Sequence, residues 1–211
     1  AAVPPPVRRV IIRPMSSDLP PPIATPRASE PEWLADGTPF SREFNDVYYS
    51  RDDGSAEARY VFLEHNRLAA RWAALPDAPG TLFVIHETGF GTGLNFLLAW
   101  QLWQSVAPAS ARLVFRSLEA FPLEAGSLAR ALQRWPELDP FTRQLLGAWP
   151  PLLPGLHTLE FDGGQVSLQS EGELSLLASA TSTHEVVGNT TRDTTRYART
   201  DVWAGTDVAA Q

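Results

Sequence analysis

The stretch HETGFGTGLNF, residues 86–96, decides the fold expected of this chain. Residues 82–85 (LFVI) run into it as a short apolar segment, as a buried parallel strand does. Residues 94–103 follow and predict a helix, because leucines recur along one face: Leu94, Leu97, Leu98 and Leu102. Three alternate glycines between strand and helix permit a tight turn and a close ligand approach, and the helix N–H groups favour a carboxylate or phosphate. This combination predicts a site for a nucleotide-like ligand.

The spacing of the glycines narrows the class of ligand. A dinucleotide fingerprint needs a third glycine at position 94 or 96, where Leu94 and Phe96 stand. A phosphate-binding P-loop ends in Gly-Lys-Ser/Thr, and this chain contains no lysine. The pattern present is acidic-x-G-x-G-x-G, with Glu87 two residues before Gly89, and it is typical of S-adenosylmethionine-dependent methyltransferases. By itself it is equally compatible with a purely structural turn.

The composition excludes several function classes. The 211 residues include no cysteine, so disulfides and thiolate metal sites are excluded, and we expect no metal site. A net charge of −7 argues against a protein that coats nucleic acid by charge alone. We find no apolar run near the ~20 residues of a membrane span and no signal peptide, so we expect no membrane contact and a cytoplasmic location.

Five arginines lie in the sequence before the glycine turn, and they could form a local basic surface although the net charge of the chain is negative. They are Arg42, Arg51, Arg59, Arg67 and Arg71. Surface arginines usually form only a solvated face. The sharper hypothesis is a phosphate-contacting face beside the ligand site.

A second strand is predicted at residues 112–118, and it ends on Glu119. In an open α/β sheet the ligand lies at the carboxyl ends of the strands. An acid there can accept hydrogen bonds from both ribose hydroxyls, although an exposed glutamate at a strand end is the plainer alternative.

The rest of the chain predicts three regions. Residues 1–30 are proline-rich and predicted to be disordered. Residues 31–169 form the predicted domain, and residues 170–211 form a threonine-rich tail that is predicted to be irregular. The further predicted elements are a short strand at 47–49, helices at 56–63, 67–72, 122–135 and 140–149, and a hairpin of 156–161 with 165–168. Strands four to seven of a doubly wound sheet should follow, and no segment predicts them. The expected fold is therefore α/β and Rossmann-like, incomplete in the C-terminal half of its sheet.

A longer set of motifs extends from about residue 33 to residue 168. In chain order they are 37–50 (GTPFSREFNDVYYS), 59–63 (RYVFL), 87–97 (ETGFGTGLNFL), 118–123 (LEAFPL) and 135–138 (WPEL). In these motifs the chain resembles the N-terminal methyltransferase domain of the bifunctional tRNA-modifying MnmC family, over roughly two thirds of its length.

The resemblance implies a Rossmann-like domain that binds S-adenosylmethionine and acts on tRNA. The family domain methylates the aminomethyl group of 5-aminomethyl-2-thiouridine at the wobble position 34, giving 5-methylaminomethyl-2-thiouridine. Carried over residue by residue, the residues at the methionine end of the cofactor would be Glu87, Gly89, Phe90, Gly91, Thr92, Gly93 and Asn95. Glu119 would hold the ribose, and Phe121 would lie near the adenine. The catalytic residues stay unknown.

The chain departs from the family after Leu168. In the family an acid that contacts adenine follows, then a strand ending Asp-Gly-Phe-Ala-Pro that supplies the substrate-side acid, and nothing similar occurs here. The FAD-dependent oxidase half is not found either, so FAD is expected only in that absent partner domain. We therefore expect a truncated domain with a partial cofactor pocket and little activity. The alternatives are a non-catalytic remnant or a tRNA- or cofactor-binding module, and a nicotinamide-dependent oxidoreductase, which the glycine spacing disfavours.

Overall fold

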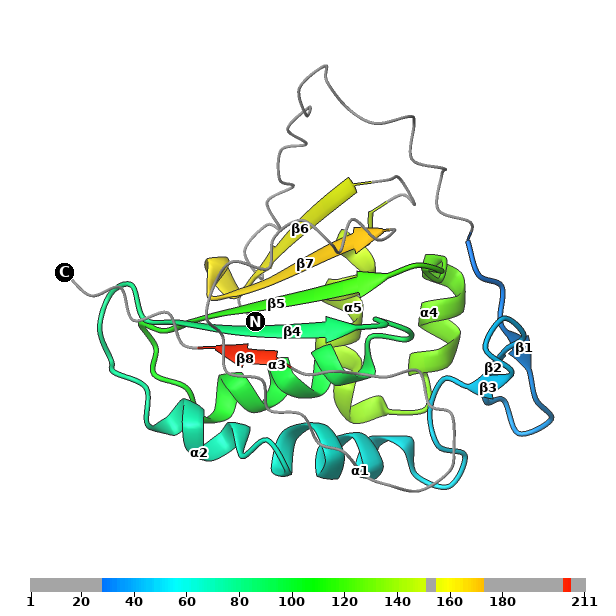
Figure 1. Ribbon diagram of the computed structural model, residues 1–211, viewed down its shortest axis with the longest axis horizontal. Helices are drawn as coiled ribbons and strands as arrows, with labels where there is room; N and C mark the ends of the chain where they lie inside the picture. The colour runs from blue at the N-terminus through cyan, green and yellow to red at the C-terminus, as the bar shows by residue number, and fades with distance from the viewer. Residues whose placement is uncertain (1–27, 151–154, 173–202, 206–211) are drawn as a thin grey trace, which may run out of the picture.

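A five-stranded sheet forms the centre of the protein. The computed structural model describes residues 28–150, 155–172 and 203–205. The strand order is β6-β7-β5-β4-β8 (Figure 1). The three middle strands run parallel: β7 (Val166–Gly172), β5 (Arg112–Glu119) and β4 (Leu82–Thr88). The two edge strands run antiparallel to their neighbours: β6 (Gly155–Phe161) and β8 (Trp203–Gly205).

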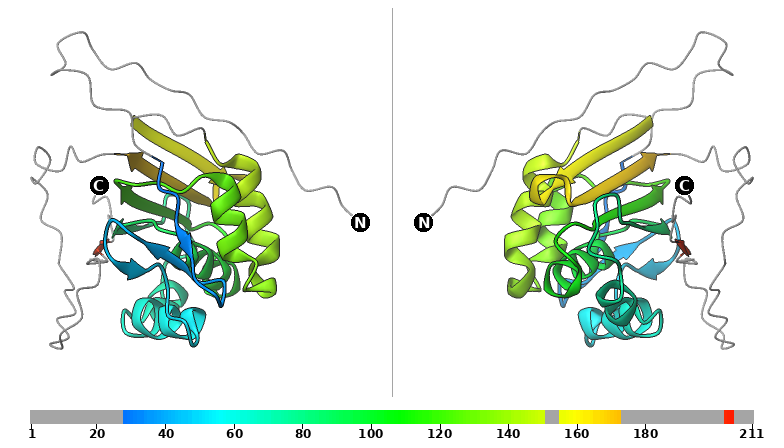
Figure 2. Two further views of the ribbon diagram at one scale, coloured as in Figure 1. Left: turned by 90° about the vertical axis from the view of Figure 1, so that its right-hand side faces the viewer. Right: turned by 90° about the vertical axis from the view of Figure 1, so that its left-hand side faces the viewer.

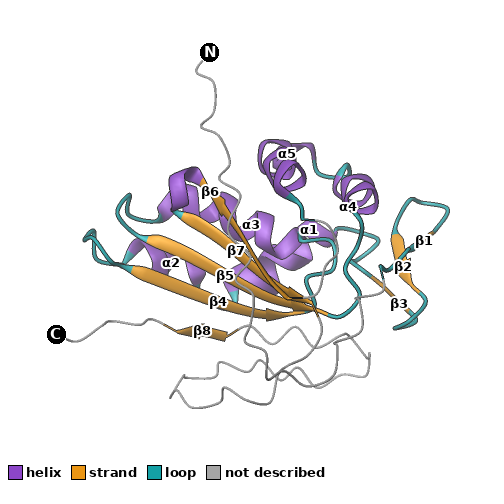
Figure 3. Ribbon diagram, turned by 90° about the horizontal axis from the view of Figure 1, so that it is seen from above, coloured by secondary structure: helices purple, strands orange, loops and turns teal. Residues whose placement is uncertain are grey.

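The described helices gather on one side of this sheet (Figure 3). The α-helices are α1 (Gly54–Ala58), α2 (Leu68–Ala73), α3 (Leu94–Val106), α4 (Ala125–Leu132) and α5 (Asp139–Ala148). A π-helix, η1 (Arg59–Glu64), continues α1, and two 3₁₀ turns are η2 (Pro136–Leu138) and η3 (Asp162–Gly164). Parallel strands joined through helices are the arrangement that the α/β prediction requires.

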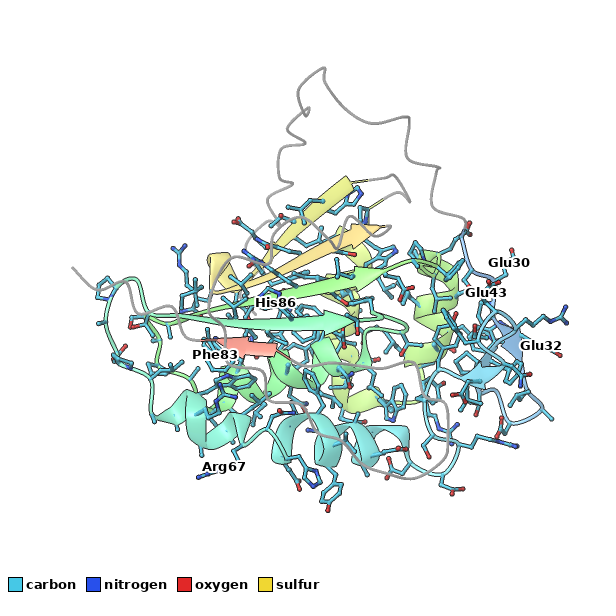
Figure 4. The ribbon with its side chains drawn as sticks, in the orientation of Figure 1. Glu30, Glu32, Glu43, Arg67, Phe83 and His86 are labelled. Carbon is cyan, nitrogen blue, oxygen red and sulfur yellow. The ribbon has the colours of Figure 1, made fainter. Side chains whose placement is uncertain are left out.

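The two faces of β4 differ in burial. Phe83, Ile85 and Glu87 point to the helix side and are buried, whereas Val84 and His86 on the other face are partly exposed. Figure 4 labels Phe83 and His86 on this strand. The prediction of a parallel strand is confirmed, but the continuous apolar run is not buried on both faces. The reason is that the described helices cover a single face of the sheet.

Helix α3 is buried on nearly all sides because it lies between the sheet and the helices α2 and α5. Its buried residues are Leu94, Phe96, Leu97, Leu98, Ala99, Trp100 and Trp103. The Trp100 ring lies 4.4 Å from Phe161 of β6, and the Phe96 ring lies 5.3 Å from Phe115 of β5. The predicted helix is confirmed, and its four leucines all face the core, with Leu102 partly buried against it.

A small antiparallel sheet lies beyond the carboxyl ends of β4 and β5 (Figures 1 and 2). Its strands are β1 (Glu32–Trp33), β2 (Pro39–Ser41) and β3 (Asp46–Val47). The guanidinium of Arg130 lies 4.0 Å over the ring of Trp33, and the ring of Tyr49 lies 4.7 Å from that of Trp135. These contacts attach the unit formed by residues 28–50, called the N-terminal unit below, to α4 and the segment after it.

Most predicted elements are confirmed, and their ends differ. Helix is present within 56–63 and 67–72, and the hairpin closes as expected with β7 reaching residue 172. The helix predicted at 122–135 is shorter, since Leu123 instead forms a β-bridge with Ser29.

The structure describes only a few residues of the two terminal segments, and those residues are ordered. Ser29 is ordered by its bridge to Leu123, residues 170–172 belong to β7, and residues 203–205 form β8. The remainder of 1–30 and of 170–211 lies outside the described residues.

Candidate functional site

The glycine turn joins β4 to α3. Gly89, Gly91 and Gly93 have φ values of +83°, +54° and +74°, all in the left-handed region that favours glycine. The Gly89 N–H donates to the carbonyl of Leu118 at 2.7 Å, which ties the turn to the end of β5. Gly93 is the N-cap of α3. The turn therefore places the first N–H groups of α3 beside the carboxyl ends of two parallel strands.

The surroundings of the three glycines differ. A Cβ atom added to Gly89 would meet no atom within 4 Å, so this position is open to a ligand. At Gly91 it would lie 3.4 Å from Cδ1 of Tyr48, and at Gly93 it would lie 2.7 Å from Cζ of Phe90. Gly93 is thus required by internal packing, and Gly89 presents the free side of the turn.

Glu119 connects the turn to the loop after β5. Its Oε2 accepts a hydrogen bond from the Gly91 N–H at 2.8 Å, and its Oε1 accepts one from the Phe121 N–H at 2.8 Å. The side chain is partly buried. An ionised carboxylate offers about four acceptor positions, so each oxygen keeps one for a further donor. The structure brings the predicted acid and the predicted glycines together.

Glu87 lies beneath the turn with its side chain in the interior. It pairs across the parallel register with Ser117, whose hydroxyl donates to Oε2 at 2.7 Å, and Asn95 Nδ2 donates to Oε1 at 3.1 Å. The residue is only 2% exposed. Burial raises the pKa of Glu87 to about 8, and the charge of Glu119 adds to the shift. Glu87 is therefore a neutral, hydrogen-bonded carboxyl near pH 7, and it braces the turn from below.

Phe90 and Thr92 face inward as well. The Phe90 ring belongs to the core and stacks on Trp149 at 5.3 Å, and Thr92 is buried. Asn95 is partly buried and committed to Glu87.

The ring of Tyr48 lies against Gly91, although the sequence pattern predicts no site role for this residue. Its hydroxyl lies 3.1 Å from Oγ of Ser29, and burial raises the pKa of the Tyr48 phenol, with the charge of Glu119 also raising it. Phe44 was also given no role, and its ring meets Phe121 edge to face at 5.6 Å. The available signal was an apolar Phe44 within the polar turn Arg-Glu-Phe-Asn.

The five arginines do not form one face. Arg42 pairs with Glu32 and Arg51 with Asp36, each at 2.8 Å, in the N-terminal unit. The other three lie elsewhere: Arg59 donates to Gln101, Arg71 lies 5.0 Å over the ring of Phe83, and Arg67 precedes α2. Figure 4 shows Arg67 far from Glu32. The solvated-surface interpretation fits this dispersion better than the phosphate-contacting face.

Neither a candidate metal site nor a candidate membrane span is found among the residues that the structure describes. Across residues 28–150, 155–172 and 203–205, no three His, Cys, Asp or Glu side chains are grouped so that they could hold a metal ion. In the same ranges no helix has the length and apolar character needed to span a membrane.

The chain is similar in sequence to known proteins. No family model matches the chain. The tRNA 5-methylaminomethyl-2-thiouridine biosynthesis bifunctional protein MnmC of Pseudomonas aeruginosa (strain UCBPP-PA14) is 56% identical over 137 residues, 65% of this chain. The chain is homologous to MnmC. The MnmC protein of Chromobacterium violaceum is 55% identical over 133 residues, and that of Legionella pneumophila is 45% identical over 133 residues; each match covers 63% of this chain. The chain spans about a fifth of the length of these MnmC relatives. The resemblance inferred from the motifs is confirmed.

Proposed function

We propose that the glycine turn and Glu119 bind S-adenosylmethionine, and that the chain is the methyltransferase domain of an MnmC-type protein. The substrate would be the aminomethyl group of 5-aminomethyl-2-thiouridine at the tRNA wobble position. One observation carries the proposal: Glu119 bridges the glycine turn and the loop after β5 at the carboxyl ends of two parallel strands. Ligands of open α/β sheets bind at this place.

The residues present fit the cofactor. The open side of Gly89 admits the methionine end, and the first N–H groups of α3 suit its carboxylate. The remaining acceptor positions of Glu119 suit two ribose hydroxyls. Phe121 follows directly and is assigned to the adenine end. Phe90, Thr92 and Gly93 contribute backbone and packing, and Glu87 with Asn95 holds the turn in shape.

The site acts mainly by alignment. When bound, S-adenosylmethionine would supply a methyl group on a positively charged sulfur. Gly89, Glu119 and the N-terminus of α3 would hold that ligand at three points. Holding two reactants in attack geometry can contribute about 7–11 kcal/mol to a reaction of this kind.

Cofactor binding without turnover is the second candidate. An attacking amine must be neutral, and a nearby carboxylate commonly takes up its proton. Glu87 is too buried for this role, and Glu119 is occupied by the turn and assigned to the ribose. Within the described residues the site thus supplies binding groups and no placed proton acceptor. A tRNA partner and a separate FAD-dependent oxidase domain belong to the same proposal.

A methyl-transfer assay tests the proposal. The whole chain is incubated with tritium-labelled S-adenosylmethionine and with tRNA that carries the 5-aminomethyl group, and tRNA that already carries the methyl group serves as the control. Label on the first tRNA alone supports the methyltransferase. Binding of S-adenosylhomocysteine without label supports the binding module. Preference for NAD over S-adenosylhomocysteine would refute both and favour the oxidoreductase.

A further inference from the structure

The N-terminal unit contacts both loops of the candidate cofactor site. Tyr48 lies against Gly91 of the glycine turn, and Phe44 lies against Phe121 of the loop after β5. Ser29 adds a third attachment, because its N–H donates to the carbonyl of Pro122 at 3.1 Å. The N-terminal unit therefore lies at the same edge of the sheet as the proposed ligand.

Phe44 is the exposed aromatic ring of this unit. It lies in the turn between β2 and β3 and is 53% exposed. Its N–H donates to Oγ of Ser41 at 3.3 Å, and Asn45 next to it has a φ of +52°. One side of the ring meets Phe121 edge to face, with an interplanar angle of 73°. The turn thus holds an apolar ring outward, next to the loop that begins at Glu119.

We propose that Phe44 forms one wall of the nucleoside pocket and stacks on the adenine ring of the cofactor. This inference rests on the proposed function. If Glu119 holds the ribose, the attached base lies beyond it, on the side of Phe121. Phe44 leans on Phe121 from the N-terminal unit and offers the second aromatic surface at that point. Adenine has the flat π-face that an aromatic side chain stacks on.

The N-terminal unit, which carries Phe44, is attached to the loop that carries Phe121. The hydroxyl of Tyr48 lies 3.1 Å from Oγ of Ser29, and Ser29 is bound to the segment at Pro122 and Leu123. These contacts connect the unit to the loop that carries Phe121. A wall that is already in place costs less ordering free energy on binding than a mobile one.

Tyr60 provides a matched control because it is an equally exposed aromatic residue on a different element. It is 57% exposed and lies on η1, where its ring packs against His65 at 4.3 Å. It belongs neither to the N-terminal unit nor to the loops of the site. Its removal changes exposed aromatic area to a similar extent without touching the proposed adenine wall.

Calorimetric titration of the whole chain with S-adenosylhomocysteine tests the proposal. Base–aromatic stacking contributes about 1–3 kcal/mol, so Phe44→Ala should weaken affinity by about 5-fold to about 140-fold. Phe44→Trp should restore it, Phe44→Leu should not, and Tyr60→Ala should leave it unchanged. Circular dichroism of each variant verifies the fold.

Three results would overturn the proposal, and they are distinguishable from one another. If the wild type binds and folded Phe44→Ala binds equally well, the adenine wall is refuted while the proposed cofactor site stands. If Phe44→Ala instead loses affinity only for an anticodon stem-loop RNA, the ring belongs to an RNA contact. A wild type that does not bind S-adenosylhomocysteine refutes the proposed function itself, and the wall with it.

Discussion

The buried carboxyl of Glu87 gives this protein a predicted pH dependence of stability. In the unfolded chain its pKa is 4.5, and burial in the folded protein raises it to about 8. Between these values the folded state binds one more proton at this position than the unfolded state. The free energy of unfolding therefore falls as pH rises. The stability contribution is fully present below pH 4.5 and is lost as pH rises through about 8.

The magnitude follows from the same two pKa values. A single proton gives a slope of about 1.4 kcal/mol per pH unit, so the loss across the window is at most about 5 kcal/mol. Solvent does not screen this contribution, because Glu87 is only 2% exposed. Glu87→Gln should remove this slope because its amide resembles the protonated carboxyl. It can accept from Asn95 Nδ2 and donate to Oγ of Ser117.

Urea unfolding followed by circular dichroism, from pH 5.5 to pH 8.5, measures the effect. The difference between variant and wild type is the relevant quantity, because other groups titrate in the same range. We expect Glu87→Gln to be more stable than the wild type at pH 8 and the gap to close toward pH 5.5. Glu57→Gln, an exposed change on α1, should run parallel to the wild type. Parallel profiles for wild type and Glu87→Gln would refute the reasoning.

Two further pairs of substitutions test the packing at the glycine turn and in the N-terminal unit. Gly93→Ala should destabilise the fold by about 3 kcal/mol, because φ is +74° and the new Cβ would meet the Phe90 ring. Gly80→Ala should cost only about 1 kcal/mol, because φ is +88° there but the space around the residue is open. Equal losses in melting temperature for the two variants would contradict the role of Phe90. Tyr48→Phe and Ser29→Ala should each lower the free energy of unfolding by about 1 kcal/mol, because each removes the hydrogen bond between the two hydroxyls at 3.1 Å. The double variant should lose no more than either single variant. Additive losses would show that the two hydroxyls are not coupled.

The local part of the site could be predicted from the sequence. A strand, three glycines and a helix are neighbours in the chain, so residues 82–103 carry their own signal. Glu119 was also predictable, since a strand end in a parallel sheet fixes where its side chain lies. These predictions depend on local pattern and on the geometry of βαβ units.

The contacts of the N-terminal unit could not be predicted in this way. Tyr48 meets Gly91 and Phe44 meets Phe121 across long separations in sequence, and no periodicity records such pairings. The hydrogen bond from Ser117 to Glu87 could not be predicted either, because it depends on the pairing of β4 with β5. The inward face of Glu87 follows from alternation along β4, since Phe83 and Ile85 lie on the same buried face.

Binding of S-adenosylhomocysteine to the wild type and to Glu119→Ala tests the central claim most directly. The account predicts saturable calorimetric binding to the wild type, loss of binding in a Glu119→Ala variant that keeps its fold, and unchanged binding in Glu57→Ala. Absence of binding to a cooperatively folded wild type would contradict the account, and so would equal affinity of wild type and Glu119→Ala.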